Sequence, residues 1–182
     1  MQTYIAILRG INVSGHKLVK MEALRTLMED LKFKNIRTYI QSGNIVFQDK
    51  KTSVSTLEKK IATKIKESFD FEVPVMVKEE KEFIDVLNHN PFLTKRKEDI
   101  TKLHVTFLSE FPDNEYVEKI KESVFSPDEF IIKEKNVYLF CPNGYGNTKL
   151  TNTFFENKLK VTATTRNWKT VTELVNIASQ LT

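Results

Sequence analysis

The stretch TYIAILR, residues 3–9, is an almost unbroken apolar run made mostly of residues that favour β-strands. A run of this kind predicts a strand buried on both faces, because a strand with one solvated face alternates apolar and polar residues. Neither face of the sheet that contains it is then fully open to water. We expect the cover to come from the other half of the chain, from an added helix or from a partner chain.

The elements expected after this strand follow a regular order. Apolar residues at helical spacing predict helices over 21–31 and 57–69, on either side of a hairpin formed by IRTYI and NIVFQ. A strand in VPVMVK and a helix in EEKEFIDVLNHN complete the first half. This is the order of the ferredoxin-like split βαβ motif.

The second half repeats this order, and two pairs of segments match in sequence as well. NIVFQ (44–48) matches NVYLF (136–140), and KEFIDVLN (81–88) matches KTVTELVN (169–176). Matches in the same order indicate a tandem duplication. The expected fold class is therefore α+β, with two ferredoxin-like (βαββαβ plus helix) subdomains and antiparallel or mixed sheets. The predicted boundaries are 1–90, a connection at 91–102, and 103–182.

The composition of the 182 residues narrows the class of protein. Cys141 is the one cysteine, which excludes an intramolecular disulfide and a multi-cysteine zinc motif. The N-terminal apolar run is too short for a signal peptide, and nothing approaches the roughly 18 apolar residues of a membrane span. We expect a cytoplasmic protein with no membrane partner. Its net charge of +4 gives only a mild preference for anions.

The segment GINVSGHKL, residues 10–18, has the glycine spacing of a phosphate-binding P-loop but not its other residues. His16 stands where the lysine belongs, and Leu18 where a hydroxyl residue should bind magnesium. A glycine-flanked loop can still bind an anion through side chains and backbone N–H groups. The alternative is a flexible connection with solvated basic residues. The candidate side chains here are Arg9, Asn12, His16, Lys17 and Lys20.

Long segments of the chain contain no acidic residue, although the helices carry many. The acid-free segments are 1–21, 31–48, 135–155 and 157–172. If they converge in space, they form a positive, polar surface. The alternative is that strand-rich segments are simply poor in Asp and Glu.

The hairpin adds a polar stripe to this pattern. Arg37, Tyr39 and Gln41 alternate along one face, where they can stack on a base and bind a phosphate. An ordinary solvated strand face has the same appearance. Asn44 flanks the turn glycine, Gly43, so turn formation is its first role.

TTRNWK, residues 164–169, combines several binding features. It precedes a helix, with Thr165 or Asn167 as the expected N-cap, and Arg166 can bind an anion at the helix start. The alternative is that Trp168 packs in the core and Arg166 pairs with an acid.

PNGYGNTK, residues 142–149, is a second glycine-containing strand-to-helix connection. It is first of all a turn. Lys149, just inside the next helix, is its candidate phosphate contact.

No set of residues stands out for covalent or metal chemistry. Cys141 and His104 lie in different predicted strands, and a small buried thiol is the simpler interpretation of the cysteine. The three histidines are scattered without metal-ligand spacing. We therefore expect no metal site and assign no catalytic residue and no cofactor.

With LRGINVSG, RTYIQSGNIVF and TTRNWKTV in view, the chain resembles DUF1697, a family of small bacterial proteins of unknown function. The resemblance covers essentially the whole length. It implies a cytoplasmic protein of two related ferredoxin-like subdomains, and it supplies no activity. Ser14 and Lys169 depart from the residues common in the family, which argues against a chemical role for those two side chains.

The function that explains the acid-free segments is binding of an anionic ligand, nucleotide-like or a nucleic acid, near the junction of the two halves. The alternatives are an enzyme acting on a small phosphorylated substrate and a structural or partner-binding protein, such as a homodimer. The predicted ligand-binding residues are Arg9, Asn12, Lys17, Arg37, Tyr39, Gln41, Asn44, Lys149, Arg166 and Asn167.

Overall fold

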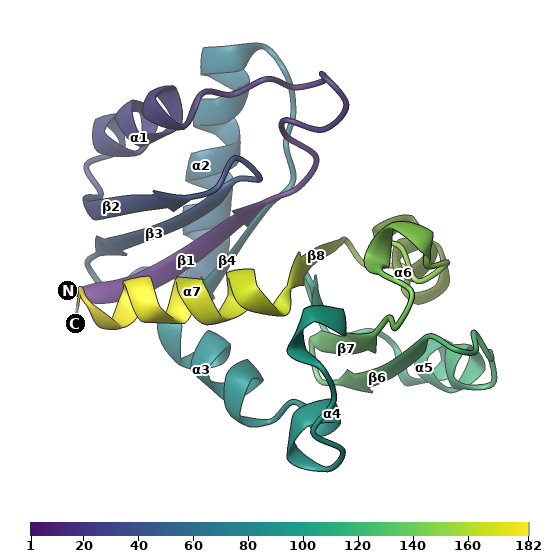
Figure 1. The fold of residues 1–182 in the computed structure, drawn as a ribbon. Coiled ribbons are helices and arrows are strands. Elements are labelled where there is room, and N and C mark those ends of the chain that lie inside the picture. The colour runs from purple at the N-terminus through teal and green to yellow at the C-terminus, as the bar shows by residue number, and fades with distance from the viewer. Residues whose placement is uncertain (182) are drawn as a thin grey trace. The chain divides into compact units, whose positions relative to one another are not determined.

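The run TYIAILR forms the central strand of a sheet in the computed structural model, which describes residues 1–181 (Figure 1). This strand, β1 (Gln2–Leu8), pairs antiparallel with β3 on one side and with β4 on the other. Its residues from Tyr4 to Leu8 are at most 1% exposed, so the prediction of burial on both faces is confirmed.

The first unit of the fold comprises Met1–Ile84 and the C-terminal residues from Glu173 onward. Its four-stranded antiparallel sheet has the strand order β2-β3-β1-β4. Its elements after β1 are α1 (Met21–Asp30), β2 (Lys34–Tyr39), β3 (Asn44–Asp49), α2 (Val54–Phe69) and β4 (Val75–Glu79).

The two faces of this sheet are covered by different helices. Tyr4, Ala6 and Leu8 belong to an apolar cluster with buried residues of α1 and α2. The opposite face is covered by the end of α7 (Trp168–Ser179), which Figure 1 shows lying across the sheet. The Gln48 side-chain amide donates to the carbonyl oxygen of Leu181 over 2.8 Å, which fixes the end of the chain to β3. An added helix thus supplies the second cover.

The second unit comprises Asp85–Thr172, so the chain leaves the first unit within α3 (Glu80–Asn88) and returns to it within α7. Its antiparallel sheet has the order β6-β7-β5-β8, the same arrangement as in the first unit. The remaining elements are α4 (Pro91–Thr94), η1 (Ile100–Lys102), β5 (Leu103–Leu108), α5 (Asn114–Lys121), β6 (Glu129–Lys133), β7 (Asn136–Phe140), η2 (Tyr145–Asn147), α6 (Asn152–Leu159) and β8 (Ala163–Asn167).

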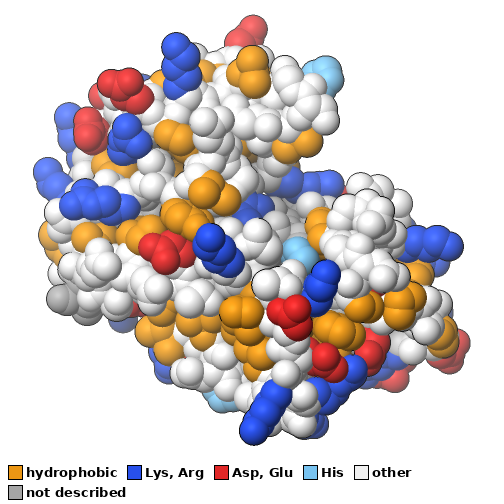
Figure 2. Space-filling view, in the orientation of Figure 1, with side chains coloured by type: hydrophobic (Ala, Val, Ile, Leu, Met, Phe, Trp, Pro, Cys, Tyr) orange, Lys and Arg blue, Asp and Glu red, His pale blue; other side chains and the backbone are white. Residues whose placement is uncertain are grey.

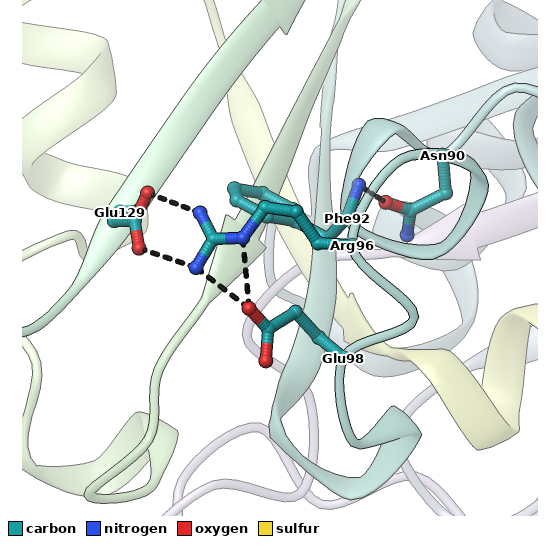
Figure 3. A network of polar contacts seen from close by, with 5 residues as sticks. All are labelled: Asn90, Phe92, Arg96, Glu98 and Glu129. Carbon is teal, nitrogen blue, oxygen red and sulfur yellow. Dashed lines mark hydrogen bonds and ion pairs between the residues drawn. The ribbon is translucent and has the colours of Figure 1, made fainter.

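The segment expected to be a connection, 91–102, packs against the second sheet. Phe92 is fully buried, and Arg96 lies over the rings of Phe92 and Phe140, 5.5 and 5.6 Å from their centroids. Figure 3 shows the Arg96 guanidinium donating to both carboxylate oxygens of Glu129, over 2.6 and 3.0 Å, and to Glu98. The segment therefore contributes to the fold of the second unit.

The structure establishes an α+β fold with two four-stranded antiparallel sheets. The mixed-sheet alternative does not occur, because every strand pair in both sheets is antiparallel. The boundaries 1–90, 91–102 and 103–182 rest on two matches between segments of the sequence, and that division stays a prediction.

Truncation of Phe92 tests whether the segment after α3 is structural. Because this side chain is fully buried, we expect Phe92→Ala to lower the free energy of unfolding by about 3–5 kcal/mol. The matched control is Phe111→Ala in the same unit. Phe111 is 67% exposed, so its loss should change stability by no more than about 0.5 kcal/mol. Equal losses in urea denaturation would show that the segment is only a connection.

Candidate functional site

Two of the acid-free segments meet at one end of the first sheet. Two hydrogen bonds hold the β2–β3 turn (40–43) in place, one from the end of β1 and one from the β1–α1 loop (9–20). The Leu8 amide donates to the Gly43 carbonyl, and the Asn12 side-chain amide donates to the Gln41 carbonyl, both over 2.8 Å. We call these two segments the loop–turn end. Two of the four acid-free segments therefore meet within the first unit, and the convergence of all four stays a prediction.

The loop is internally hydrogen-bonded. Val13 and His16 form an antiparallel bridge, and the Asn12 amide donates to the Lys17 carbonyl over 3.1 Å. Its backbone is also unusual. Positive φ angles occur at Gly10, Asn12, Ser14, Gly15 and Lys17.

The facing turn contains a second backbone outlier. Ile40 has a φ of 47°, a conformation that β-branched residues rarely adopt. Strained residues persist where the surrounding structure holds them, and they cluster at binding and catalytic sites. The outlier marks the loop–turn end as a candidate site.

Two of the predicted ligand contacts stabilise this end. Asn12 donates to the carbonyls of Val19 and Gln41, and its oxygen accepts from the Val19 amide. Asn44 is fully buried and donates to the Tyr39 carbonyl and the Ser42 hydroxyl. These side chains shape the surface, and the amide hydrogens of Asn12 are already committed.

Lys17 is also tied to the fold. Its ammonium donates to the Glu72 carbonyl over 2.6 Å, at the connection between α2 and β4. The carboxylate of Glu72 bonds to Lys66, and this hydrogen bond lowers its pKa. Lys17 therefore anchors the tip of the loop while its charge stays at the surface.

The other side chains at and near the loop–turn end are cationic, aromatic, amide and apolar. Arg37 and Gln41 are exposed, and Arg9 and Tyr39 are half-buried. Val13, Leu18 and Ile40 are at least half exposed. Figure 2 shows apolar side chains beside Lys or Arg, His and Asp or Glu side chains at the upper edge of the first unit, where Figure 1 places this loop. Such a surface suits a ligand that carries both negative charge and an apolar or ring-shaped part.

Close packing at Gly43 holds the turn against β1. A Cβ atom at this position would lie 2.7 Å from Leu8 Cβ and 2.8 Å from Ile11 Cδ1, and φ is +79°. We expect Gly43→Ala to lower the free energy of unfolding by about 2–4 kcal/mol. Gly10→Ala is the matched control, because φ is +74° but nothing lies within 4 Å of the added carbon. Its cost should be only about 1–2 kcal/mol. If urea denaturation gave the same loss of stability for Gly43→Ala and Gly10→Ala, the close packing of Gly43 against Leu8 would be contradicted.

The other three predicted residues lie in the second unit. Arg166 is buried, and its guanidinium donates to the Thr164 hydroxyl and the Thr165 carbonyl over 3.0 and 2.9 Å. Burial lowers the pKa of Arg166 to about 10. Asn167 caps α7 by accepting from the Thr170 amide over 2.8 Å, so one of the two expected N-caps is confirmed. Lys149 is exposed.

The sequence did not single out the aromatic neighbour of this group. Tyr145 stacks on His104 with ring centroids 4.8 Å apart, and it interacts electrostatically with Arg166. Burial lowers the pKa of His104, partly offset by the backbone of Lys102. Tyr145 lies between the two glycines of PNGYGNTK, and this position in a glycine-containing loop could have marked it as a candidate site residue. Trp168 is only 6% exposed, in agreement with a core position.

Cys141 is a buried thiol, and burial raises its pKa to about 11. It is therefore protonated near neutral pH and unsuited to nucleophilic attack. Within residues 1–181, no group of three or more His, Cys, Asp or Glu side chains is arranged to hold a metal ion. In the same residues, no helix has the length and apolarity needed to cross a bilayer.

The environment of His104 predicts a pH dependence of stability. A lowered pKa in the fold means that the unfolded chain binds the proton first, so stability falls as pH drops below 6.5. We expect the urea midpoint to decrease as the pH falls below 6.5, with a smaller slope in His104→Gln. The slope separates titration from the loss of stacking on Tyr145, which is independent of pH. Identical slopes would contradict this assignment.

These features define an α+β protein whose two units have the same strand order. Residues 1–138 match the family described as "Protein of unknown function (DUF1697)", so the chain belongs to this family and the resemblance is confirmed. A solved structure, "conserved bacterial protein SP0830 from Streptococcus pneumoniae", is similar in fold, with a TM-score of 0.77 and 23% identity over 97% of this chain and 98% of that chain. No curated protein matches the chain.

The predicted site is thus divided between the two units. Seven of its residues lie at or near the loop–turn end, and Lys149, Arg166 and Asn167 lie in the second unit. That all ten form one surface stays a prediction.

Proposed function

We propose that this protein binds an anionic ligand, nucleotide-like or a nucleic acid, at the loop–turn end of its first unit. The convergence of two acid-free segments carries the proposal. The hydrogen bond from Asn12 to the Gln41 carbonyl brings together residues from 1–21 and from 31–48, which contain no Asp or Glu. The two segments therefore bring several basic side chains to one end of the unit and supply no carboxylate of their own.

The residues at this end have separate roles in the proposal. Arg9 and Arg37 bind phosphate, because a guanidinium presents paired donors that match two phosphate oxygens. Tyr39, which alternates with Arg37 along β2, stacks on a base or ring. Gln41 orients the ligand, while Asn12, Lys17 and Asn44 hold the loop and turn in place.

The second unit carries predicted ligand-binding residues of its own. Arg166 lies among the hydroxyls of β8, beside Tyr145, and Lys149 lies at the surface. Asn167 orients the start of α7.

A second candidate function is an enzyme acting on a small phosphorylated substrate. The observation that favours it is His104, whose lowered pKa keeps the imidazole neutral near pH 7, beside Tyr145. A neutral imidazole can accept a proton, and Arg166 nearby can bind the substrate anion.

We also infer that the two units are ferredoxin-like and arose by tandem duplication. The shared strand order, β2-β3-β1-β4 and β6-β7-β5-β8, supports this inference. We further propose that the protein acts in the cytoplasm. A homodimer is the third functional alternative, and a single species of monomer mass in sedimentation would argue against it.

Binding is tested by fluorescence anisotropy with a labelled short single-stranded RNA, followed by competition with unlabelled ATP. We expect the double variant Arg9→Gln/Arg37→Gln to bind about tenfold more weakly than the unchanged protein. The control is Lys59→Gln/Lys60→Gln, which removes the same charge from an exposed part of α2.

The salt dependence distinguishes the two ligand classes. A steep fall in RNA affinity with salt indicates a polyanion, whereas competition by ATP with a shallow salt slope indicates a nucleotide. Absence of binding at low salt, or equal weakening in both double variants, would overturn the proposal.

A further inference from the structure

The second unit contains a pocket that the anion-binding proposal does not use. Its volume is about 610 Å³, within the range of sites that enclose a small molecule. It lies between the last turns of α3 and the β6–β7 hairpin, and all its lining residues belong to the second unit. The residues that line it are Asp85, Val86, His89, Lys133, Glu134, Asn136 and Tyr138.

Tyr138 is the polar residue buried most deeply in this pocket. Its side chain is only 2% exposed, and within residues 1–181 its hydroxyl has no hydrogen-bond partner. Burial, together with the charges of Glu134 and Asp85, raises the pKa of Tyr138 to about 12. Because Tyr138 lines the pocket, a ligand there can form a hydrogen bond with its hydroxyl.

The charges around the hydroxyl favour a cation. Asp85 and Glu134 approach Tyr138 from α3 and from the β6–β7 turn, and neither forms an ion pair within residues 1–181. Lys133 is exposed at the mouth, where its ammonium lies 3.4 Å from the His89 carbonyl. His89 itself donates to the Asp85 carbonyl over 2.8 Å. Two carboxylates thus face one lysine.

We propose that this pocket binds a small molecule through a primary ammonium group, held by Asp85, Glu134 and the Tyr138 hydroxyl. An ammonium has three N–H donors, and two carboxylates with a hydroxyl oxygen offer three acceptors. Charge-assisted bonds of this kind are stronger than those between neutral groups. Val86, which is buried, and the Tyr138 ring supply apolar surface for the remainder of the ligand.

The test uses three probes of similar shape and different charge: benzylamine, benzyl alcohol and benzoate. Binding is followed by changes in the amide NMR signals of the intact protein. We expect saturable shifts around Asn136 and Tyr138 with benzylamine alone. Asp85→Asn/Glu134→Gln should weaken its binding about tenfold, and Tyr138→Phe about fivefold. The control for the last variant is Tyr116→Phe, a partly buried tyrosine of the same unit outside the pocket.

Unlike the carboxylate and tyrosine variants, Lys133→Gln is not expected to weaken benzylamine binding. Removing a like charge should preserve or strengthen benzylamine binding, since Lys133 repels the probe. The proposal is wrong if benzylamine gives no saturable shift, if benzyl alcohol binds as tightly, or if the carboxylate variants bind unchanged. It is also wrong if benzoate binds and Lys133→Gln weakens that binding. None of these outcomes affects the loop–turn end, because the two sites share no residue.

Discussion

Burial of β1 on both faces is the constraint on which the rest of the first unit depends. A strand that is apolar on each side requires a cover on each side, but α1 and α2 both pack on one. The second cover is the end of α7, which the chain reaches only after forming the whole second unit. The residues that complete the first unit therefore follow the whole second unit in the sequence. The Gln48 bond to Leu181 joins residues 133 positions apart within the first unit, so this unit contains contacts of very long sequence separation.

The same strand also fixes the geometry of the candidate site. Leu8, at the end of β1, leaves no room for a side chain at Gly43, so the β2–β3 turn packs directly against the backbone where the β1–α1 loop begins. Asn12 then joins the loop to the turn. Basic and amide residues separated by some thirty positions meet because of this packing, and the same turn contains Ile40 with its positive φ angle.

Local periodicity predicted much of the fold and part of the candidate site. The apolar run at β1, the Gly43 hairpin and the alternation of Arg37 with Tyr39 are all local signals, and the structure contains each of them. Asn12 and Asn44 show what sequence patterns cannot predict. A side-chain amide can bind a ligand or form hydrogen bonds with the backbone, and only the tertiary contacts show which of the two it does. The segment after α3 was expected to connect, since its buried Phe92 and its Arg96–Glu129 pair have no local periodicity. The pocket at Tyr138 depends on residues from α3 and a distant hairpin, so no contiguous motif marks it.

The two sheets have the same strand order, but the connections at corresponding positions carry different charges. β5 occupies in the second sheet the place that β1 occupies in the first, and the β6–β7 turn corresponds to the β2–β3 turn. After β1 the chain makes a long loop without acids; after β5 it runs through Ser109–Asp113, which is short and acidic. The first turn carries Gln41, whereas the second carries Glu134. Because the sheets constrain the strands and leave these connections free, the charge of the connections can differ between the units at little cost in stability. One arrangement of strands thereby supports a cationic surface in one unit and an anionic pocket in the other.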